Sequence, residues 1–262
     1  DRFGGSGTIS GGITFNNFKK VELDTHLHVT DIECLNTSAK DNPSFYGSVF
    51  ASGDVGITGP LQSVLLDINA STTKAGTLHI PLASASKATN SNLLSFYEPE
   101  KVIYIDPYDM MMHKAATQTS GKNDLRVKLQ INATPNLEGL VELDKDAGNV
   151  LSTFGYGNIA LDIRPSREVF NINGDYNITK GSFHFVALGI AKKDFTLTEG
   201  SNIKFNGNIM DSDLNVKGIY TTKTSLSTLI VDTSSVSARK TVECGIGISD
   251  KLKNPRLEFS ID

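Results

Sequence analysis

The feature that most constrains this chain is an alternation of apolar and polar residues with a period of two, which recurs along most of its length. In the stretch "KVELDTHLHVT", the apolar residues Val21, Leu23, Leu27 and Val29 alternate with polar ones. Because successive side chains of a β-strand point to opposite faces, each such run predicts a strand with one apolar face. Equivalent runs occur at residues 64–68, 78–82, 125–131, 159–163, 170–178, 195–197, 203–205, 214–216, 242–248 and 257–261.

Helical periodicity is nearly absent from the same sequence. No window of a dozen residues keeps apolar side chains at i, i+3, i+4 and i+7, and Thr, Asn, Ser and Gly interrupt every candidate. Turn signals such as "TGP", "TKGS" and "TEGS" separate the runs. The pattern therefore predicts an all-β fold, either a sandwich, a barrel or a stacked array of strands.

The stretch "FNINGDYNITKGSFHF", residues 170–185, shows a change of parity within one run. Apolar residues occupy even positions up to Ile178 and odd positions from Phe183 onwards. A turn resets the register of a chain, so we interpret this stretch as a β-hairpin with its turn centred on Lys180 and Gly181.

Composition excludes several classes of partner. The formal net charge is -4 over 262 residues, with no basic cluster, so we expect no nucleic-acid partner. No stretch approaches the ~18 consecutive apolar residues of a membrane-spanning helix. The chain begins at Asp1 without an initiator Met, and we interpret it as a piece of a longer, processed protein.

The sequence offers few candidates for chemistry. His26 and His28 share one strand face with Asp24, and two imidazoles at that spacing can bind zinc. They occupy the polar parity, however, so we interpret them as solvated surface residues. No GxSxG motif and no partnered nucleophile is present. We therefore expect no catalytic residues, no metal site and no cofactor.

Several stretches of the C-terminal half occur in an order that resembles a known family. They are "NATPNLEGLVELD", "GYGNIALDI", "FNINGDYNITKGSFHF", "KDFTLTEGSNIKFNGNIMDSDLNVKGIY" and "KNPRLEFSID". Together they resemble the C-terminal region of TamB, the inner-membrane component of the translocation and assembly module of Gram-negative bacteria. The earlier stretch "PSFYGSVFASGDVGITGPLQSVLLDINASTTKAGTLHIPL" is similar to repeats just upstream in that family.

The resemblance implies an elongated, curved, largely antiparallel sheet, a U-shaped β-taco with an apolar groove. In this family the groove is proposed to shield phospholipid acyl chains between the inner and outer membranes, and to support assembly of nascent outer-membrane proteins beside an Omp85-family barrel, TamA. The implied location is the periplasm, with an inner-membrane anchor outside this sequence. The residues expected to line the groove are Phe170, Ile172, Tyr176, Ile178, Phe183, Phe185, Phe195, Leu197, Ile203, Phe205, Leu214, Val216, Val242, Ile246, Ile248, Leu257, Phe259 and Ile261.

The expected organisation is one continuous architecture with an interruption. Residues 1–98 form β-taco repeats, residues 99–122 form an irregular insertion whose later half is a candidate for disorder, and residues 123–262 continue the sheet. We expect Cys34 and Cys244 to stay unpaired, because a disulfide needs Cα atoms within about 7 Å and these residues lie on distant strands of such a sheet.

Two alternatives to lipid transport remain open from the sequence. The first is a structural, chaperone-like scaffold whose sheet edge receives β-strands of outer-membrane proteins. The second is an extracellular β-rich adhesin or carbohydrate-active protein. Whether the apolar faces enclose an open groove or a filled core is a further open question, since a sandwich would cover them with a second sheet.

Overall fold

The computed structural model describes most of the chain. The described residues are 1–16, 20–43, 45–81, 124–144, 148–187, 191–224 and 240–261. The insertion expected at residues 99–122 lies outside them.

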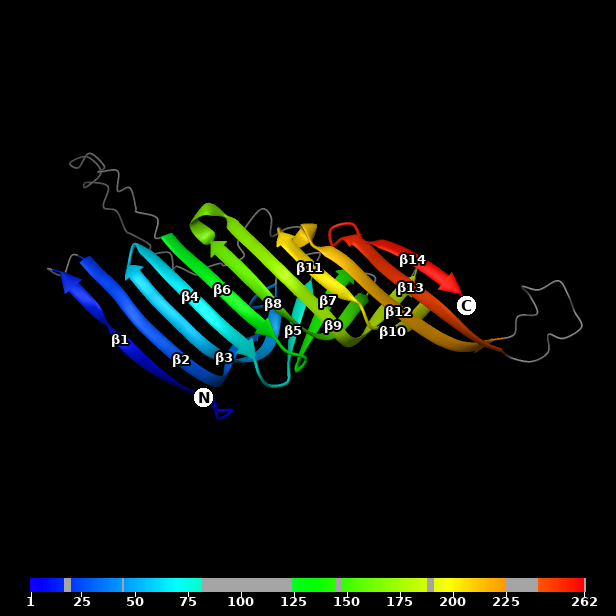
Figure 1. Ribbon diagram of the computed structural model, residues 1–262, viewed down its shortest axis with the longest axis horizontal. Coiled ribbons are helices and arrows are strands. Elements are labelled where there is room, and N and C mark those ends of the chain that lie inside the picture. The colour runs from blue at the N-terminus through cyan, green and yellow to red at the C-terminus, as the bar shows by residue number, and fades with distance from the viewer. Residues whose placement is uncertain are drawn as a thin grey trace, which may run out of the picture.

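Within the described residues, fourteen strands form a single sheet, which confirms the all-β, largely antiparallel fold (Figure 1). The main path through the sheet runs β1-β2-β3-β4-β6-β8-β9-β10-β12-β13-β14. The strands are β1 (Ser6–Asn16), β2 (Lys20–Thr37), β3 (Tyr46–Pro60), β4 (Ser63–Thr72), β5 (Gly76–Pro81), β6 (Asp124–Ala133), β7 (Leu137–Asp144), β8 (Asn149–Arg164), β9 (Val169–Ala187), β10 (Ala191–Leu197), β11 (Asn202–Gly207), β12 (Asp213–Thr224), β13 (Lys240–Lys251) and β14 (Arg256–Ile261).

Two strand pairs depart from the antiparallel pattern. β4 pairs with β6 in parallel, and β5 pairs with β7 in parallel. Along the chain, β5 and β6 are separated by residues 82–123. The two parallel pairs therefore join the strands before this segment to the strands after it in one sheet. Two short 3-10 helices, η1 (Pro165–Arg167) and η2 (Ile209–Asp211), precede β9 and β12 in the described part of the chain.

The sheet bends along a line of strand interruptions, which we call the crease. β4 and β5 both pair with β3 and are interrupted at residues 73–75. β6 and β7 both pair with β8 and are interrupted at 134–136, while β10 and β11 both pair with β9 and are interrupted at 198–201. Interruptions and bulges bend a strand, and their alignment across the sheet makes the bend a property of the whole sheet.

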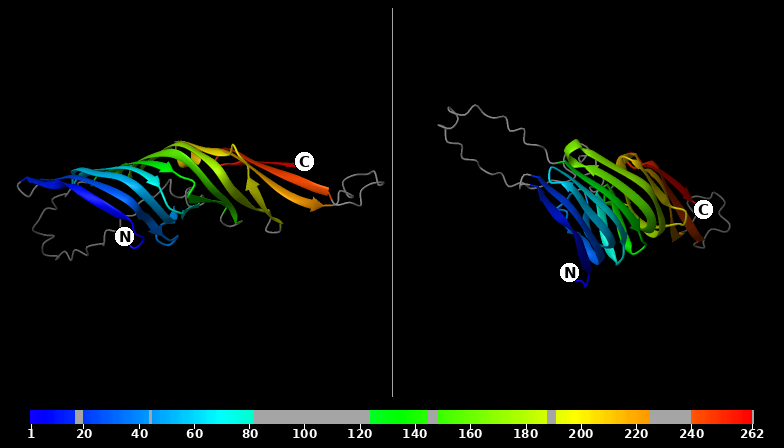
Figure 2. Two further views of the ribbon diagram at one scale, coloured as in Figure 1. Left: turned by 60° about the horizontal axis from the view of Figure 1, so that its bottom comes forward. Right: turned by 60° about the vertical axis from the view of Figure 1, so that its left-hand side comes forward.

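The crease divides the sheet into two walls. The long wall carries β1, β4, β6 and β11, and the short wall carries β5, β7 and β10; the remaining long strands cross from one wall to the other. In Figure 1 the short-wall strands β5 and β7 are seen behind the long wall, and Figure 2 shows the curvature from two further sides.

Hydroxyl groups satisfy the backbone where the strands are interrupted. The Thr134 amide donates a hydrogen bond to Oγ1 of Thr72 at 2.8 Å. The Lys217 amide donates to Oγ of Ser201 at 3.0 Å, and this hydroxyl donates to the carbonyl of Thr198 at 2.8 Å. Thr72 and Ser201 are buried. Buried backbone groups without partners would be costly, so these side chains stabilise the bend.

The hairpin expected at residues 170–185 is wrong, because β9 runs through the whole stretch as one strand of nineteen residues. The change of parity arises from a β-bulge instead. Lys180 pairs with Phe154 and Ile178 pairs with Gly155, which leaves Thr179 as an extra residue. One extra residue on one strand shifts every later side chain to the opposite parity, as a turn does, but without reversing the chain.

Candidate functional site

One face of the sheet is apolar across most strands, and we call it the apolar face. A representative row on the long wall consists of register partners on four neighbouring strands: Ile68 on β4, Leu129 on β6, Leu161 on β8 and Ile172 on β9. A matching row on the short wall contains Val141, Leu151 and Phe183 on β7, β8 and β9. The alternation in the sequence therefore places apolar side chains side by side over the width of the sheet.

Burial of the apolar face increases towards the C-terminal strands. Leu129 and Leu161 are half-buried. Ile172, on the next strand, is 7% exposed, and Leu151 and Phe183 are each 1% exposed. The C-terminal part of this face is therefore packed as a core, whereas its N-terminal part remains partly accessible.

The eighteen residues predicted to line a groove fall into three groups by burial. Fifteen belong to β9–β13, and three belong to β14. The buried ones are Ile172, Ile178, Phe183, Phe195, Leu197, Ile203, Leu214, Val216, Val242, Ile246 and Ile248; the half-buried ones are Phe170, Tyr176, Phe185 and Phe205; the exposed ones are Leu257, Phe259 and Ile261.

The packed core joins residues from both walls. Phe183, Phe195 and Leu151 of the short wall belong to the same cluster as Ile203 and Leu214 of the long wall. Leu151 and Val141 were missed by sequence reasoning, because the alternation in their segments is short. The sequence signal that could have identified them is the turn-like stretch "DKDAGN", because Val141 and Leu151 lie in the strand-like runs on either side of it.

The two ends of the sheet present apolar side chains to solvent. On β1, Ile9 and Ile13 are 71% and 53% exposed, and on β14, Phe259 and Ile261 are 58% and 72% exposed. The rings of Phe259 and Phe185 nevertheless contact each other, with centroids 5.5 Å apart. β14 therefore reaches the short wall across the C-terminal end of the apolar face.

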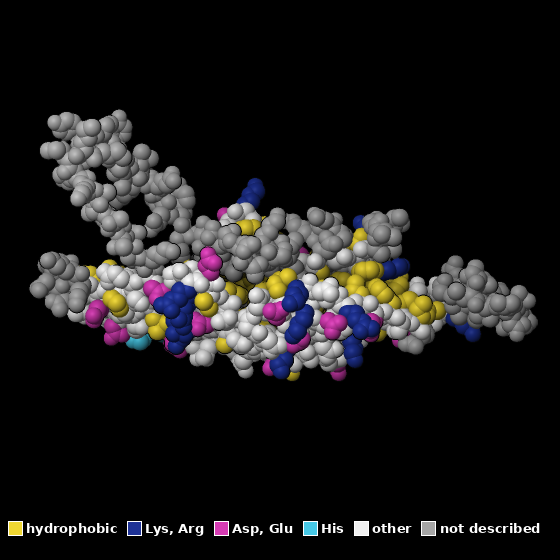
Figure 3. Space-filling model, turned by 90° about the horizontal axis from the view of Figure 1, so that it is seen from above, with side chains coloured by type: hydrophobic (Ala, Val, Ile, Leu, Met, Phe, Trp, Pro, Cys, Tyr) yellow, Lys and Arg dark blue, Asp and Glu magenta, His cyan; other side chains and the backbone are white. Residues whose placement is uncertain are grey.

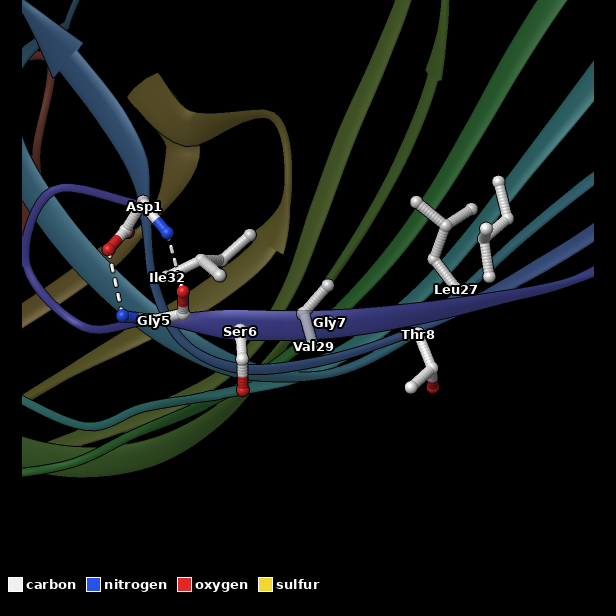
Figure 4. Close-up of a pocket in the computed structure, with 9 residues that line it drawn as sticks. Asp1, Gly5, Ser6, Gly7, Thr8, Leu27, Val29 and Ile32 are labelled. Carbon is white, nitrogen blue, oxygen red and sulfur yellow. Dashed lines mark hydrogen bonds between the residues drawn. The ribbon is translucent and has the colours of Figure 1, made fainter.

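A hollow of about 440 Å³ lies on the apolar face near the N-terminus (Figure 4). Apolar side chains from β1 and β2 line it, including Ile9, Leu27, Val29 and Ile32. The N-terminal loop borders it, where the Gly5 amide donates a hydrogen bond to Oδ1 of Asp1 at 2.8 Å. The hollow therefore lies in the accessible N-terminal part of the apolar face.

A lysine lies at the margin of the apolar face, on the short wall. Lys193 of β10 pairs in register with Phe185, and its Nζ donates a hydrogen bond to the Tyr220 hydroxyl at 3.1 Å. The same Nζ lies 4.6 Å from the centre of the Tyr220 ring. Figure 3 shows hydrophobic side chains gathered over the C-terminal strands, with Lys or Arg side chains at their margin.

The histidines considered for zinc lie on the opposite face. His26 and His28 are 62% and 64% exposed and contact Asp24 and Asp54 at 3.2 Å and 2.7 Å, respectively. Their position confirms that they are surface residues. Within the described part of the chain, no three His, Cys, Asp or Glu side chains gather where they could hold a metal ion.

Comparison with known proteins places the chain in a family. The model of the TamB C-terminal domain matches residues 1–262, the whole chain. The chain belongs to the TamB C-terminal domain family. This confirms the family resemblance seen in the sequence and identifies the chain as part of a TamB-like cell-envelope protein. No curated protein matches it. Among the described residues of this TamB domain, no helix is long and apolar enough to cross a membrane.

Proposed function

We propose that this TamB domain shields the acyl chains of phospholipids on its apolar face, in the periplasm, during transport between the inner and outer membranes. An Omp85-family barrel of the TamA kind is the proposed partner at the outer membrane, where the domain also supports assembly of outer-membrane proteins. The proposed role is non-catalytic, and the proposed anchor is an inner-membrane segment outside this sequence.

The observation that carries the proposal is the continuity of the apolar face. Apolar register partners extend from β4 through β6 and β8 to β9, and those at Leu129 and Leu161 are only half-buried. Extended apolar strips are a liability for a protein in water unless an apolar partner covers them. Family membership supports a lipid as that partner.

The energetics suit transport better than tight capture. A chain of ~16 carbons gains on the order of 12 kcal/mol when it leaves water, at about 0.8 kcal/mol per CH₂. A bilayer offers the chain a similar gain. Transfer between the bilayer and the apolar face is then nearly neutral, as a conduit requires.

Site-specific photo-crosslinking in the living envelope tests the proposal. Leu129 and Leu161 are register partners on the apolar face, while Gln130 and Ala160 are exposed register partners on the opposite face. A photoreactive residue at either leucine should capture phospholipid, detected by mass spectrometry, and one at Gln130 or Ala160 should not. Equal capture from both faces, or none from the leucines in a folded and functional protein, would reject the proposal.

A second candidate function rests on β14. Within the described residues, β14 pairs only with β13, so its other edge is available for strand addition. A scaffold that receives strands of outer-membrane proteins would use this edge. A crosslinker at the exposed Ser260 on β14 should then capture outer-membrane protein segments rather than lipid.

A further inference from the structure

The short wall has an uneven distribution of charge on its apolar face. Among the short-wall residues whose side chains the structure describes, the charged ones at apolar-face positions are Lys193 on β10 and Lys240 on β13, and both are exposed. Both lie towards the end of the wall that is remote from the crease. Acidic residues of the same strands, such as Asp194 and Glu243, occupy the opposite parity. The margin is therefore basic along β10 and β13, whereas on β7 Asp144 is the register partner of Asn149.

Lys193 is held in place without an acidic partner. Its Nζ donates to the Tyr220 hydroxyl at 3.1 Å and lies over the Tyr220 ring, and no carboxylate in the described part of the chain forms an ion pair with it. The nearest acid along its strand, Asp194, contacts His184 at 2.6 Å on the opposite face. A cation over an aromatic ring is positioned but not neutralised.

The Tyr220 hydroxyl can donate a hydrogen bond as well as accept one. Hydrogen bonds from Lys193 and then from Thr222 lower the pKa of the Tyr220 phenol. The phenol oxygen accepts the hydrogen bond from Lys193, and the hydroxyl keeps one O–H of its own as a donor. An ammonium group and a phenol hydroxyl thus lie together at one point of the margin.

Apolar groups adjoin this point on the side of the core. Phe185 is the register partner of Lys193, and the Phe185 ring contacts Phe259 at 5.5 Å. The Tyr220 ring contacts the buried Phe195 ring at 6.1 Å. The arrangement suits an amphiphile whose apolar part lies against the aromatic rings and whose anionic part lies at the margin, because lysine ammonium groups bind phosphate as point charges.

We propose that Lys193 and the Tyr220 hydroxyl bind the phosphate of a phospholipid whose acyl chains lie against the half-buried Phe185 and the exposed Phe259 beside them. This inference rests on the proposed function, since it assigns the headgroup subsite of the same lipid. Lys240, at the same margin, adds long-range attraction for the anion but is not part of the contact.

Binding measurements on the 262-residue chain test the inference with three probes: dioctanoyl phosphatidylglycerol below its micelle concentration, dioctanoylglycerol, which has no phosphate, and inorganic phosphate. The variants are Lys193→Met, Lys193→Arg, Tyr220→Phe and the control Lys192→Met. Lys192 is the neighbouring residue, also exposed but on the opposite face. Because Lys193 is exposed, its replacement should leave the fold intact, which denaturant titration checks.

We expect Lys193→Met to weaken binding of phosphatidylglycerol about five- to tenfold, corresponding to one charge-assisted contact, and to leave dioctanoylglycerol unaffected. Lys193→Arg should retain binding, Tyr220→Phe should weaken it by a smaller factor, and Lys192→Met should have no effect. Inorganic phosphate alone should bind too weakly to saturate at millimolar concentration.

Four results would overturn the inference. If Lys193→Met bound phosphatidylglycerol as well as the parent does, Lys193 would not be part of a phosphate site. If Lys192→Met lost as much affinity as Lys193→Met, general positive charge rather than a specific site would attract the lipid. A parallel loss for dioctanoylglycerol would indicate a packing role, and saturable binding of inorganic phosphate that depends on Lys193 would indicate a free-phosphate site. If the unmodified chain bound both lipids, the proposed function would stand in each of these cases; binding of neither lipid would overturn both proposals.

Discussion

The rings of Phe185 and Phe259 lie 5.5 Å apart, although β10, β12 and β13 separate their strands in the sheet order. Neighbouring strands are about 4.8 Å apart, so a flat sheet would hold these rings on the order of 19 Å from each other. The contact therefore requires the C-terminal part of the sheet to curl until β14 meets the end of β9. It brings β14 over this end of the apolar face, although Phe259 itself stays 58% exposed.

Removing this contact should loosen β14. Cys244 pairs in register with Ile261 of β14 and packs against the core, so its thiol reports on displacement of the strand. In a Cys34→Ser background, Phe259→Ala should increase the rate of Cys244 labelling several-fold, because an aromatic pair contributes about 0.5–1.5 kcal/mol beyond its buried area.

Phe3→Ala provides the matched control for this experiment. It removes an aromatic contact of similar ring separation at the other end of the sheet, where the Phe3 and Phe50 rings lie 5.3 Å apart. It should leave the labelling of Cys244 unchanged. If Phe259→Ala and Phe3→Ala gave the same rate as the parent, β14 would be held by its pairing with β13 alone.

The bulge at Thr179 should be required for folding of the short wall. Deleting Thr179 would place Phe183 and Phe185 on the outer parity, so we expect the free energy of unfolding to fall by several kcal/mol. Thr179→Ala keeps the bulge and loses one exposed hydrogen bond, from Oγ1 to the Phe154 carbonyl at 2.9 Å, and should cost less than ~1 kcal/mol. Denaturant titration compares them, and equal stabilities would argue against the bulge as the device that sets parity.

Buried and exposed positions of the apolar face should differ sharply in their contribution to stability. Leu151 is 1% exposed in the core, and Ile9 is 71% exposed on β1. We expect Leu151→Ala to cost about 3 kcal/mol through lost burial and the resulting cavity, and Ile9→Ala to cost less than ~0.5 kcal/mol. Similar costs at both positions, measured by chemical denaturation, would show that the face is uniformly packed.

The sequence specified much of this fold but not the continuity of its strands. Period-two alternation predicted the all-β class and which side chains share a face. The stretch around Thr179 was interpreted as a hairpin because a turn and a bulge both change parity, and "TKGS" is compatible with either. Only long-range pairing decides between them, since β8 pairs with β9 on both sides of Thr179. The "TEGS" segment, residues 198–201, is likewise an interruption between β10 and β11 rather than a strand-reversing turn.

The sites are less evident from the sequence than the fold. Cys34 and Cys244 are free, as predicted. The proximity of Phe185 to Phe259, and of Lys193 to Tyr220, depends on how far the sheet curls, and no local pattern encodes that curvature. A lysine at an apolar-face position was the available signal for the basic margin, because it interrupts the alternation at "AKKDFTL".

Acid should weaken the long wall through Asp162. Arg126 donates two hydrogen bonds to this carboxylate, at 3.0 Å and 2.8 Å, and they lower the pKa of Asp162 to about 2. The folded pKa lies below the unfolded value of about 3.9, so the stabilisation is complete above pH ~5 and is lost as the pH falls through 2. The side chain is 32% exposed, and with solvent screening we expect about 1 kcal/mol at pH 7. The difference in unfolding free energy between the parent and Asp162→Asn should therefore shrink towards zero near pH 2. A difference between the parent and Asp162→Asn that did not depend on pH would show that the ion pair does not contribute in this way.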